Sequence, residues 1–425
     1  MRRLALLLCG AALGSAQIPP GDIGAENTRR SELLAYVARN TPDYKERLER
    51  IVPRLRALAE RVKAREAAGQ NTSCSHQILT ESATLSSSVT DLAALERRLD
   101  ELERVLAHPE EEAKADRQDT ADGSWGACHE AWFFRVNATY DHLTTRSNAN
   151  EKPAYPLRLF DRVNSPEKLR EYFMSLAVSD LPRTGIDHRK ELNESLSNLM
   201  RLILHDRPTY YAWHPGLKDV LVDVILHRLR NTQTGWWGET YVRNGGRVFV
   251  DDLSITFHVI SYLHGEVPDL DRMVAHLLAV KGQDYPIGWL EEGTNSNHHN
   301  MDVVVLLRYG WPYLNDAQKR TAAAEIRRMM DWCLRESLQA DGSFPADKGS
   351  SDSIEEANSW GVSFLSRIGY FDARNRFWTE EKFPEAEAVR LKLIAFIEKH
   401  VKSGGAGGAY YEDDLAVLKS AQTDR

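Results

Sequence analysis

The chain has 425 residues, of which 54 are basic and 62 acidic, for a formal net charge of −8. An acidic chain without a basic block lacks the positive charge that nucleic acids and anionic membranes attract, so we expect neither as a partner. No stretch reaches the roughly 18 consecutive apolar residues that a membrane-spanning helix needs. We therefore expect no integral membrane segment in the mature chain.

The N-terminus has the pattern of a secretory signal peptide over residues 1–16. Met1-Arg2-Arg3 is basic, and the run from Leu4 to Leu13 is apolar. Small residues then continue to Ala16, ahead of a mature start at Gln17. Because such leaders are removed on export, we expect a secreted or periplasmic protein.

Three cysteines remain after cleavage of this leader, so the mature chain can form one disulfide. Cys74 and Cys128 are the expected pair, since both lie in predicted loops or helix starts. Cys333 lies in an apolar helical pattern and is expected to be a buried thiol.

Three Asn-x-Ser/Thr triplets match the acceptor pattern for N-linked glycosylation, which applies if the source is eukaryotic. They begin at Asn71, Asn137 and Asn193.

Residues 17–121 are predicted to form an N-terminal helical hairpin followed by a charged linker. Apolar residues recur with 3-4 spacing over 48–62 and again over 92–106, as in helices that pack along a heptad seam. A Ser/Thr-rich stretch, 71–90, joins the two segments. We favour a hairpin folded back on the main domain over the alternative, an arm for self-association or partner binding.

Residues 122–425 are predicted to be all-α and built from a repeated helix pair. A Gly-aromatic turn, a polar stretch and an apolar helix recur in this region, beginning at Gly123, Gly235, Gly288 and Gly342. The last three turns are 53 and 54 residues apart, which fits one helix pair per repeat. We expect the pairs to close into an (α/α) toroid, with an open solenoid as the alternative. A short β-hairpin is expected at 240–250.

This layout resembles the α/α-toroid superfamily, which includes six-hairpin glycosidases, several polysaccharide lyase families and terpenoid cyclases. Three segments are similar to turns of the lyases: Thr184-Gly185-Ile186-Asp187-His188-Arg189, Trp236-Trp237-Gly238-Glu239 and Asp341-Gly342-Ser343-Phe344. The resemblance covers roughly residues 123–425 and is at the level of the superfamily. It implies a carbohydrate substrate bound across the ends of the inner helices.

For a lyase, the polar run from Asn295 to Asp302 supplies the candidate base. His298 and Asp302 are four residues apart, so both can face one ligand from a helix, and a histidine readily moves protons near neutral pH. We expect His298 or His299 as the catalytic base. Asn297 and Arg189 would stabilise the developing negative charge. The alternative for this run is a helix-capping region.

For a glycoside hydrolase, Glu239 and Asp252 are the expected acid and base or nucleophile. The indoles of Trp236, Trp237 and Trp289 would then stack on sugar rings in either enzyme. The alternatives are that the tryptophans pack the ends of helices and that Asp252 caps the next helix.

Two rival functions remain open at this point. One is a non-catalytic secreted protein that binds glycans or acts as a helical-repeat scaffold. The other is a terpenoid-cyclase-like enzyme, since Glu412-Asp413-Asp414 resembles the acidic motifs of that group; a run so near the C-terminus is more typical of a solvated face. We expect no cofactor and no metal, because neighbouring histidines such as His298 and His299 point about 100° apart on a helix.

Overall fold

The computed structural model describes residues 23–88, 91–144, 152–204, 210–243, 246–290, 295–346, 353–402 and 408–423. The predicted signal peptide lies outside these residues. Most of the described chain is helical and one small sheet accompanies the helices, which confirms the predicted all-α class at this level.

The chain divides into two compact units. The first unit holds residues up to Leu229 together with Gly238–Val250, and the second holds Arg230–Trp237 and Asp251–Arg425. The expected boundary near residue 121 therefore lies inside the first unit.

The first unit contains the following helices and strands: α2 (Ile23–Asn40), α3 (Tyr44–Ala67), α4 (Ser73–Ser88), α5 (Leu92–Ala107), η1 (Pro109–Lys114), α6 (Trp132–Thr144), η2 (Arg158–Arg162), α7 (Pro166–Leu176), β1 (Val178–Ser179), α8 (Leu181–Thr184), α9 (Arg189–Leu204), α10 (Leu217–His227), β2 (Gly238–Arg243) and β3 (Gly246–Asp251), whose last residue already belongs to the second unit. The second unit contains α11 (Leu253–Tyr262), α12 (Leu270–Ala279), α13 (Asn297–Gly310), η3 (Trp311–Tyr313), α14 (Asp316–Trp332), η4 (Cys333–Ser337), α15 (Ile354–Arg367), η5 (Ala373–Asn375), α16 (Ala386–Lys402) and α17 (Gly408–Ser420).

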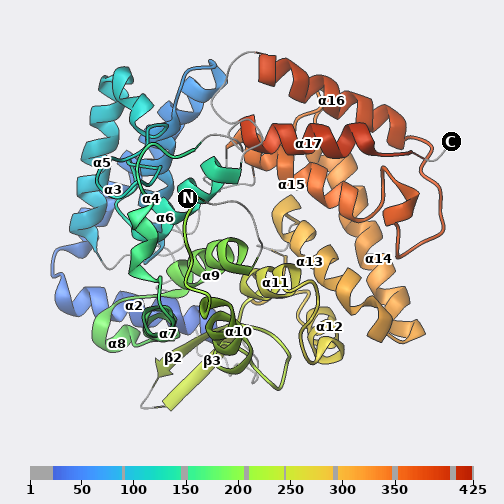
Figure 1. Ribbon diagram of the computed structural model, residues 1–425, viewed down its shortest axis with the longest axis horizontal. Helices are drawn as coiled ribbons and strands as arrows, with labels where there is room; N and C mark the ends of the chain where they lie inside the picture. The colour runs from blue at the N-terminus through green and yellow to red at the C-terminus, as the bar shows by residue number, and fades with distance from the viewer. Residues whose placement is uncertain are drawn as a thin grey trace. The chain divides into compact units, whose positions relative to one another are not determined.

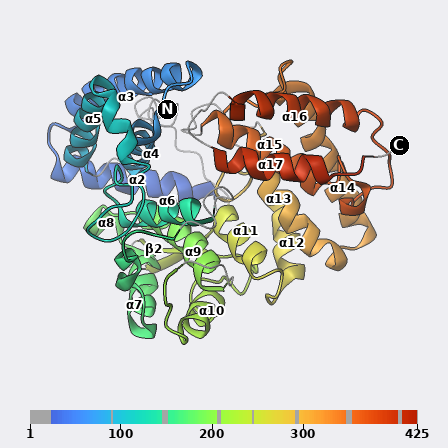
Figure 2. The same ribbon diagram turned by 45° about the horizontal axis from the view of Figure 1, so that its top comes forward.

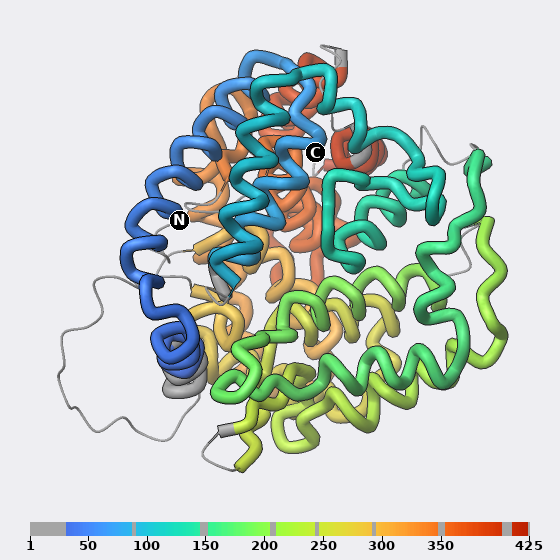
Figure 3. Tube along the Cα trace, turned by 90° about the vertical axis from the view of Figure 1, so that its left-hand side faces the viewer, coloured from blue at the N-terminus to red at the C-terminus, as the bar shows by residue number. Residues whose placement is uncertain are grey.

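The predicted N-terminal hairpin is a bundle of three helices rather than two. The Ser/Thr-rich stretch expected to link the heptad segments is itself helix α4, which packs against α5 beside α3 (Figures 2 and 3). Ile78 and Leu79 of α4 join the apolar core of the bundle, and this burial outweighs the weak helix propensity of serine and threonine. The heptad face is covered: Leu55, Leu99 and Leu102 are at most 4 % exposed. The apolar side chains of the heptad seam are therefore packed inside the bundle.

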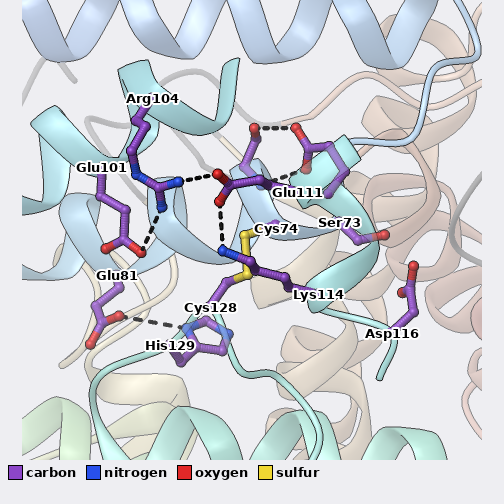
Figure 4. Close-up of a disulfide and its surroundings, with 12 residues drawn as sticks. Ser73, Cys74, Glu81, Glu101, Arg104, Glu111, Lys114, Asp116, Cys128 and His129 are labelled. Atoms are coloured by element: carbon purple, nitrogen blue, oxygen red, sulfur yellow. Dashed lines mark hydrogen bonds and ion pairs between the residues drawn. A yellow bond between two sulfur atoms is a disulfide. The ribbon is translucent and has the colours of Figure 1, made fainter. Parts of the chain in front are cut away.

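A disulfide joins α4 to the segment that precedes α6, which confirms the pairing of Cys74 with Cys128 (Figure 4). A buried ion pair lies nearby, because Arg98, only 1 % exposed, donates to Glu81 and to the carbonyl of Cys128. A buried charge needs such partners to offset its lost hydration. Cys333 is a free, buried thiol, as expected.

The β-hairpin expected at 240–250 is present as β2 and β3, and a strand that the sequence did not suggest lies beside it. The strand order is β1-β2-β3, and β1 pairs with β2 in parallel, with Val178 opposite Thr240. This pairing places the end of β1 and the start of α9 next to β2.

In the second unit, helices α11, α13, α15 and α17 each pack against the next one in this order (Figure 1). Helix α12 packs on α13, and α16 packs on α17. Contacts at matching ends show that α15 runs in the same direction as α13 and α17. At their N-terminal ends, Glu355 of α15 accepts hydrogen bonds from the backbone of Tyr410 and Tyr411 in α17. At the C-terminal ends, Arg308 of α13 donates to the carbonyl of Arg367 in α15.

The repeated Gly-aromatic turns share one structural contact. The backbone N–H of the aromatic residue donates to a polar side chain on the following helix in three of the repeats: Trp125 to Thr139, Trp237 to Thr256 and Phe344 to Asn358. The turn glycines Gly235 and Gly342 have φ of +76° and +94°, a conformation that favours glycine. In these three repeats the turn therefore anchors a buried aromatic residue against the helix that follows it.

Candidate functional site

The three tryptophans expected to stack on a substrate are packing residues. Trp236, Trp237 and Trp289 are all 0 % exposed. The Trp236 indole donates to the carbonyl of Met273, and the backbone of Trp237 is fixed by Thr256. A ring without exposed surface cannot stack on a sugar, so the assignment of these indoles to substrate contact is corrected here.

His298, at the start of α13, is the expected base that solvent reaches. Its side chain is 32 % exposed, and Nε2 lies 3.9 Å from a carboxyl oxygen of Asp302, one helical turn further on. The imidazole stacks on the half-buried ring of Trp360 from α15, with centroids 4.4 Å apart. The predicted His298–Asp302 pair is thus formed, and Trp360 adds an aromatic face that the sequence did not link to it.

Asp302 lies beneath this imidazole and is fully buried. Neither of its carboxyl oxygens has a hydrogen-bond partner among the described residues. Burial raises the pKa of Asp302 well above its ordinary value, because the charged form loses its hydration. The site thus places a buried carboxyl with a raised pKa directly beneath a partly exposed imidazole.

The other residues of the polar run hold the helix start. His299 is 5 % exposed and stacks on Tyr285, with centroids 4.2 Å apart. Its backbone donates to the capping hydroxyl of Ser296. Asn297 is also buried, and its amide donates to Ser337 at 2.8 Å. His299 and Asn297 are thus not exposed to a substrate, whereas His298 is the histidine of the run that solvent reaches.

Glu239 lies in a separate cluster, in the first unit. It is 2 % exposed and accepts a short hydrogen bond from Ser179 of β1. Burial, followed by the charge of Asp187, raises the pKa of Glu239 well above its ordinary value, while Arg189 acts in the opposite direction. Tyr241 donates to Asp187 at 3.1 Å. Glu239 and Arg189 are therefore close enough to interact electrostatically, but the carboxyl is closed off from solvent.

Asp252 has the capping role that was its alternative interpretation. It precedes α11 and accepts from the backbone N–H of Ile255 at 2.9 Å, and it is 2 % exposed. The neighbouring Asp251 accepts from Asn231 and lies 3.1 Å from His276. Neither carboxyl is placed to act on a substrate, which removes Asp252 from the expected hydrolytic pair.

Two further acids sit where α15 and α17 meet. Glu355 is held by the two backbone N–H groups of α17, and Asp414 accepts from Ser359. Burial raises the pKa of both carboxyls to about 8. Asp414 was expected on a solvated face and is 4 % exposed instead. The burial of Asp414 could have been suggested from sequence only by a helical-wheel comparison of α17 with its neighbours.

The described residues contain no group of three or more His, Cys, Asp or Glu side chains that could hold a metal ion. In the same part of the chain, no helix combines the length and apolar content needed to cross a membrane. No protein-family model matches the sequence, and no match was found among curated proteins or solved structures.

Proposed function

We propose that the protein is an exported carbohydrate-active enzyme that cleaves a uronate-containing glycan by β-elimination, with His298 as the base. The observation that supports this most strongly is the open imidazole of His298 between the buried acid Asp302 and the ring of Trp360. A general base must be able to reach the proton that it removes, and histidine is the side chain suited to move protons near neutral pH. The imidazole of His298 is partly exposed and meets the first condition.

In the proposed reaction, His298 takes up the proton and later returns it. Neutral His298 removes the proton from the carbon next to the uronate carboxylate, and the glycosidic C–O bond on the adjacent carbon breaks as the carbon–carbon double bond forms. The imidazolium then returns its proton to the leaving oxygen. Asp302 acts as a positioning residue, since its buried carboxyl lies against this imidazole, with an oxygen 3.9 Å from Nε2.

Elimination is favoured over hydrolysis because of where the carboxyls lie. Hydrolysis needs two carboxyl groups that flank the scissile bond. Glu239 is buried, and Asp252 is engaged as a helix cap. The exposed group in the described cluster is an imidazole, which suits proton abstraction.

Two other observations support the wider proposal. The common direction of α13, α15 and α17 brings the polar starts of these helices to one end, as an (α/α) toroid would require. The Cys74–Cys128 disulfide suits an oxidising compartment, in agreement with the leader-like N-terminus.

The proposal is tested by incubating the protein with a panel of uronate-containing and neutral polysaccharides. We expect ultraviolet absorbance from an unsaturated product with one or more of the uronate polymers, and none with His298→Gln. His227→Gln, which alters an exposed histidine at the end of α10, serves as the matched control and should retain the activity.

Three outcomes would overturn the proposal. New reducing ends without ultraviolet absorbance would indicate a hydrolase. Binding of a glycan without cleavage would indicate a scaffold or binding protein. Full activity in His298→Gln would remove the base from the mechanism.

A further inference from the structure

Asn71 lies in the turn that leads into α4 and is exposed, in contrast to most of the polar residues discussed above. It begins the triplet Asn71-Thr72-Ser73, the acceptor pattern for N-linked glycosylation. Its surroundings differ from those of the other two triplets.

The local geometry leaves the amide nitrogen of Asn71 toward solvent. Its side-chain oxygen accepts from the backbone N–H of Ser73 at 2.9 Å and from the Ser73 hydroxyl at 2.8 Å. Its nitrogen has only a long contact of 3.4 Å with the exposed carboxylate of Asp116. The hydroxyl and the amide that define the triplet are thus already in contact, while the nitrogen that would carry a sugar is weakly held.

The other two triplets lie inside helices and are engaged. Asn193 of α9 is 7 % exposed, and the hydroxyl of its triplet, Ser195, bonds to Tyr172. A glycan on Asn193 would have no room in the folded chain. Asn137 of α6 is half-buried and donates to Asp141 at 2.9 Å. The hydroxyl of its triplet, Thr139, is 0 % exposed and accepts from a backbone N–H.

We propose that Asn71 is the N-glycosylation site of this chain in a eukaryotic secretory pathway. The inference rests on the export that forms part of the proposed function. The co-reactant is a lipid-pyrophosphate-linked oligosaccharide. A bond forms between the Asn71 side-chain nitrogen and the first carbon of the sugar, the bond from that carbon to the pyrophosphate oxygen breaks, and the amide gives up one proton to the released lipid pyrophosphate.

Glycosylation here would cover the loop beside the disulfide. Cys74 follows Ser73 directly and is bonded to Cys128. A glycan on Asn71 therefore shields the end of α4 that this crosslink holds, and it leaves the start of α13, on which the proposed chemistry depends, unmodified.

The test is expression of the full chain in yeast with residues 1–16 replaced by a proven secretory leader and with a glycosylation triplet in a C-terminal tag as an internal control. Wild type, Asn71→Gln, Ser73→Ala, Ser73→Thr and Asn137→Gln are compared before and after endoglycosidase treatment. We expect one glycan beyond that of the tag, lost in Asn71→Gln and Ser73→Ala and retained in Ser73→Thr and Asn137→Gln.

A wild-type chain that carries a glycan on the tag alone would overturn the inference, as would a glycan retained in Asn71→Gln. The chain with its own residues 1–16 is expressed in parallel. Retention of that form in the cytosol, with the leader-replaced form modified at Asn71, would contradict the proposed export by residues 1–16 and would support Asn71 as the glycosylation site.

Discussion

Glu239 in the first unit and His298 in the second are both expected catalytic residues, and both lie beside a second titratable group. Glu239 is sealed by Ser179 and neighbouring side chains and is 2 % exposed. His298 sits above the buried Asp302 with 32 % of its side chain exposed. The raised pKa of Glu239 is a consequence of its burial, as it is for Asp302.

A strongly shifted carboxyl is therefore not enough to mark a catalytic site. In an active site, we expect a carboxyl with a raised pKa to lie next to a group that the substrate can reach. The second unit provides such a pair, whereas the first provides a buried acid held by the fold.

The largest expected effect is on turnover. His298→Gln should reduce the rate of glycan cleavage by about 10²–10⁴-fold, the usual contribution of a general base, while the melting temperature changes little because the imidazole is partly exposed. Glu239→Gln should retain most of the activity. Steady-state kinetics with circular dichroism on both variants measures this contrast. The reverse ranking would place the chemistry in the first unit.

The next effect is on the stability of the first unit. Replacing Cys74 and Cys128 by serine removes a crosslink between residues 54 positions apart. Loop-closure entropy predicts a loss of about 4 kcal/mol. Denaturant unfolding measures it, and the free cysteine Cys333 remains as the internal thiol control. An unchanged unfolding midpoint would show that the three-helix bundle does not depend on this bond.

A smaller effect is expected in the pH dependence of stability. Because the pKa of Glu239 is raised, the folded chain binds one more proton than the unfolded chain above the ordinary carboxyl pKa. Stability then falls with rising pH, by about 1.4 kcal/mol per pH unit, until the raised pKa is passed. Glu239→Gln cannot ionise and should be relatively more stable at alkaline pH. Melting temperatures across a pH series measure the difference, and parallel curves for the two proteins would contradict it.

The same reasoning applies more weakly where α15 meets α17. Glu355 and Asp414 have pKa values of about 8, so their contribution to stability is lost between the ordinary carboxyl range, near 4, and about pH 8. Glu355→Gln keeps the acceptor for Tyr410 and Tyr411 and removes the titration. We expect hydrogen exchange in α17 to become less pH-dependent in this variant. Unchanged pH dependence would show that the carboxyl does not titrate there.

Local rules predicted the features that depend on short spacing. His298 and Asp302 meet because residues four apart share a helix face, and Asp252 caps α11 as an aspartate before an apolar run should. The β-hairpin at 240–250 likewise follows from its turn residues. The pairing of Cys74 with Cys128 followed from the odd cysteine count together with the expected position of both residues in loops or helix starts.

Features set by packing between distant segments were missed. The stretch containing Ile78 and Leu79 was read as a linker because serine and threonine are weak helix formers, yet its burial against α5 makes it helix α4. The indoles of Trp236 and Trp289 were read as ligand contacts because sequence does not report exposure. The stack of Trp360 on His298 joins two helices whose register only the fold determines.

Because of this stack, the fluorescence of Trp360 should report the protonation of His298. A protonated imidazole in contact with an indole quenches its fluorescence, whereas a neutral one does so much less. Trp360 should therefore dim as His298 gains its proton, against the steady emission of sealed indoles such as Trp237. The emission of a Trp360→Phe variant, subtracted from that of the wild type, would give the titration curve of one histidine without any label.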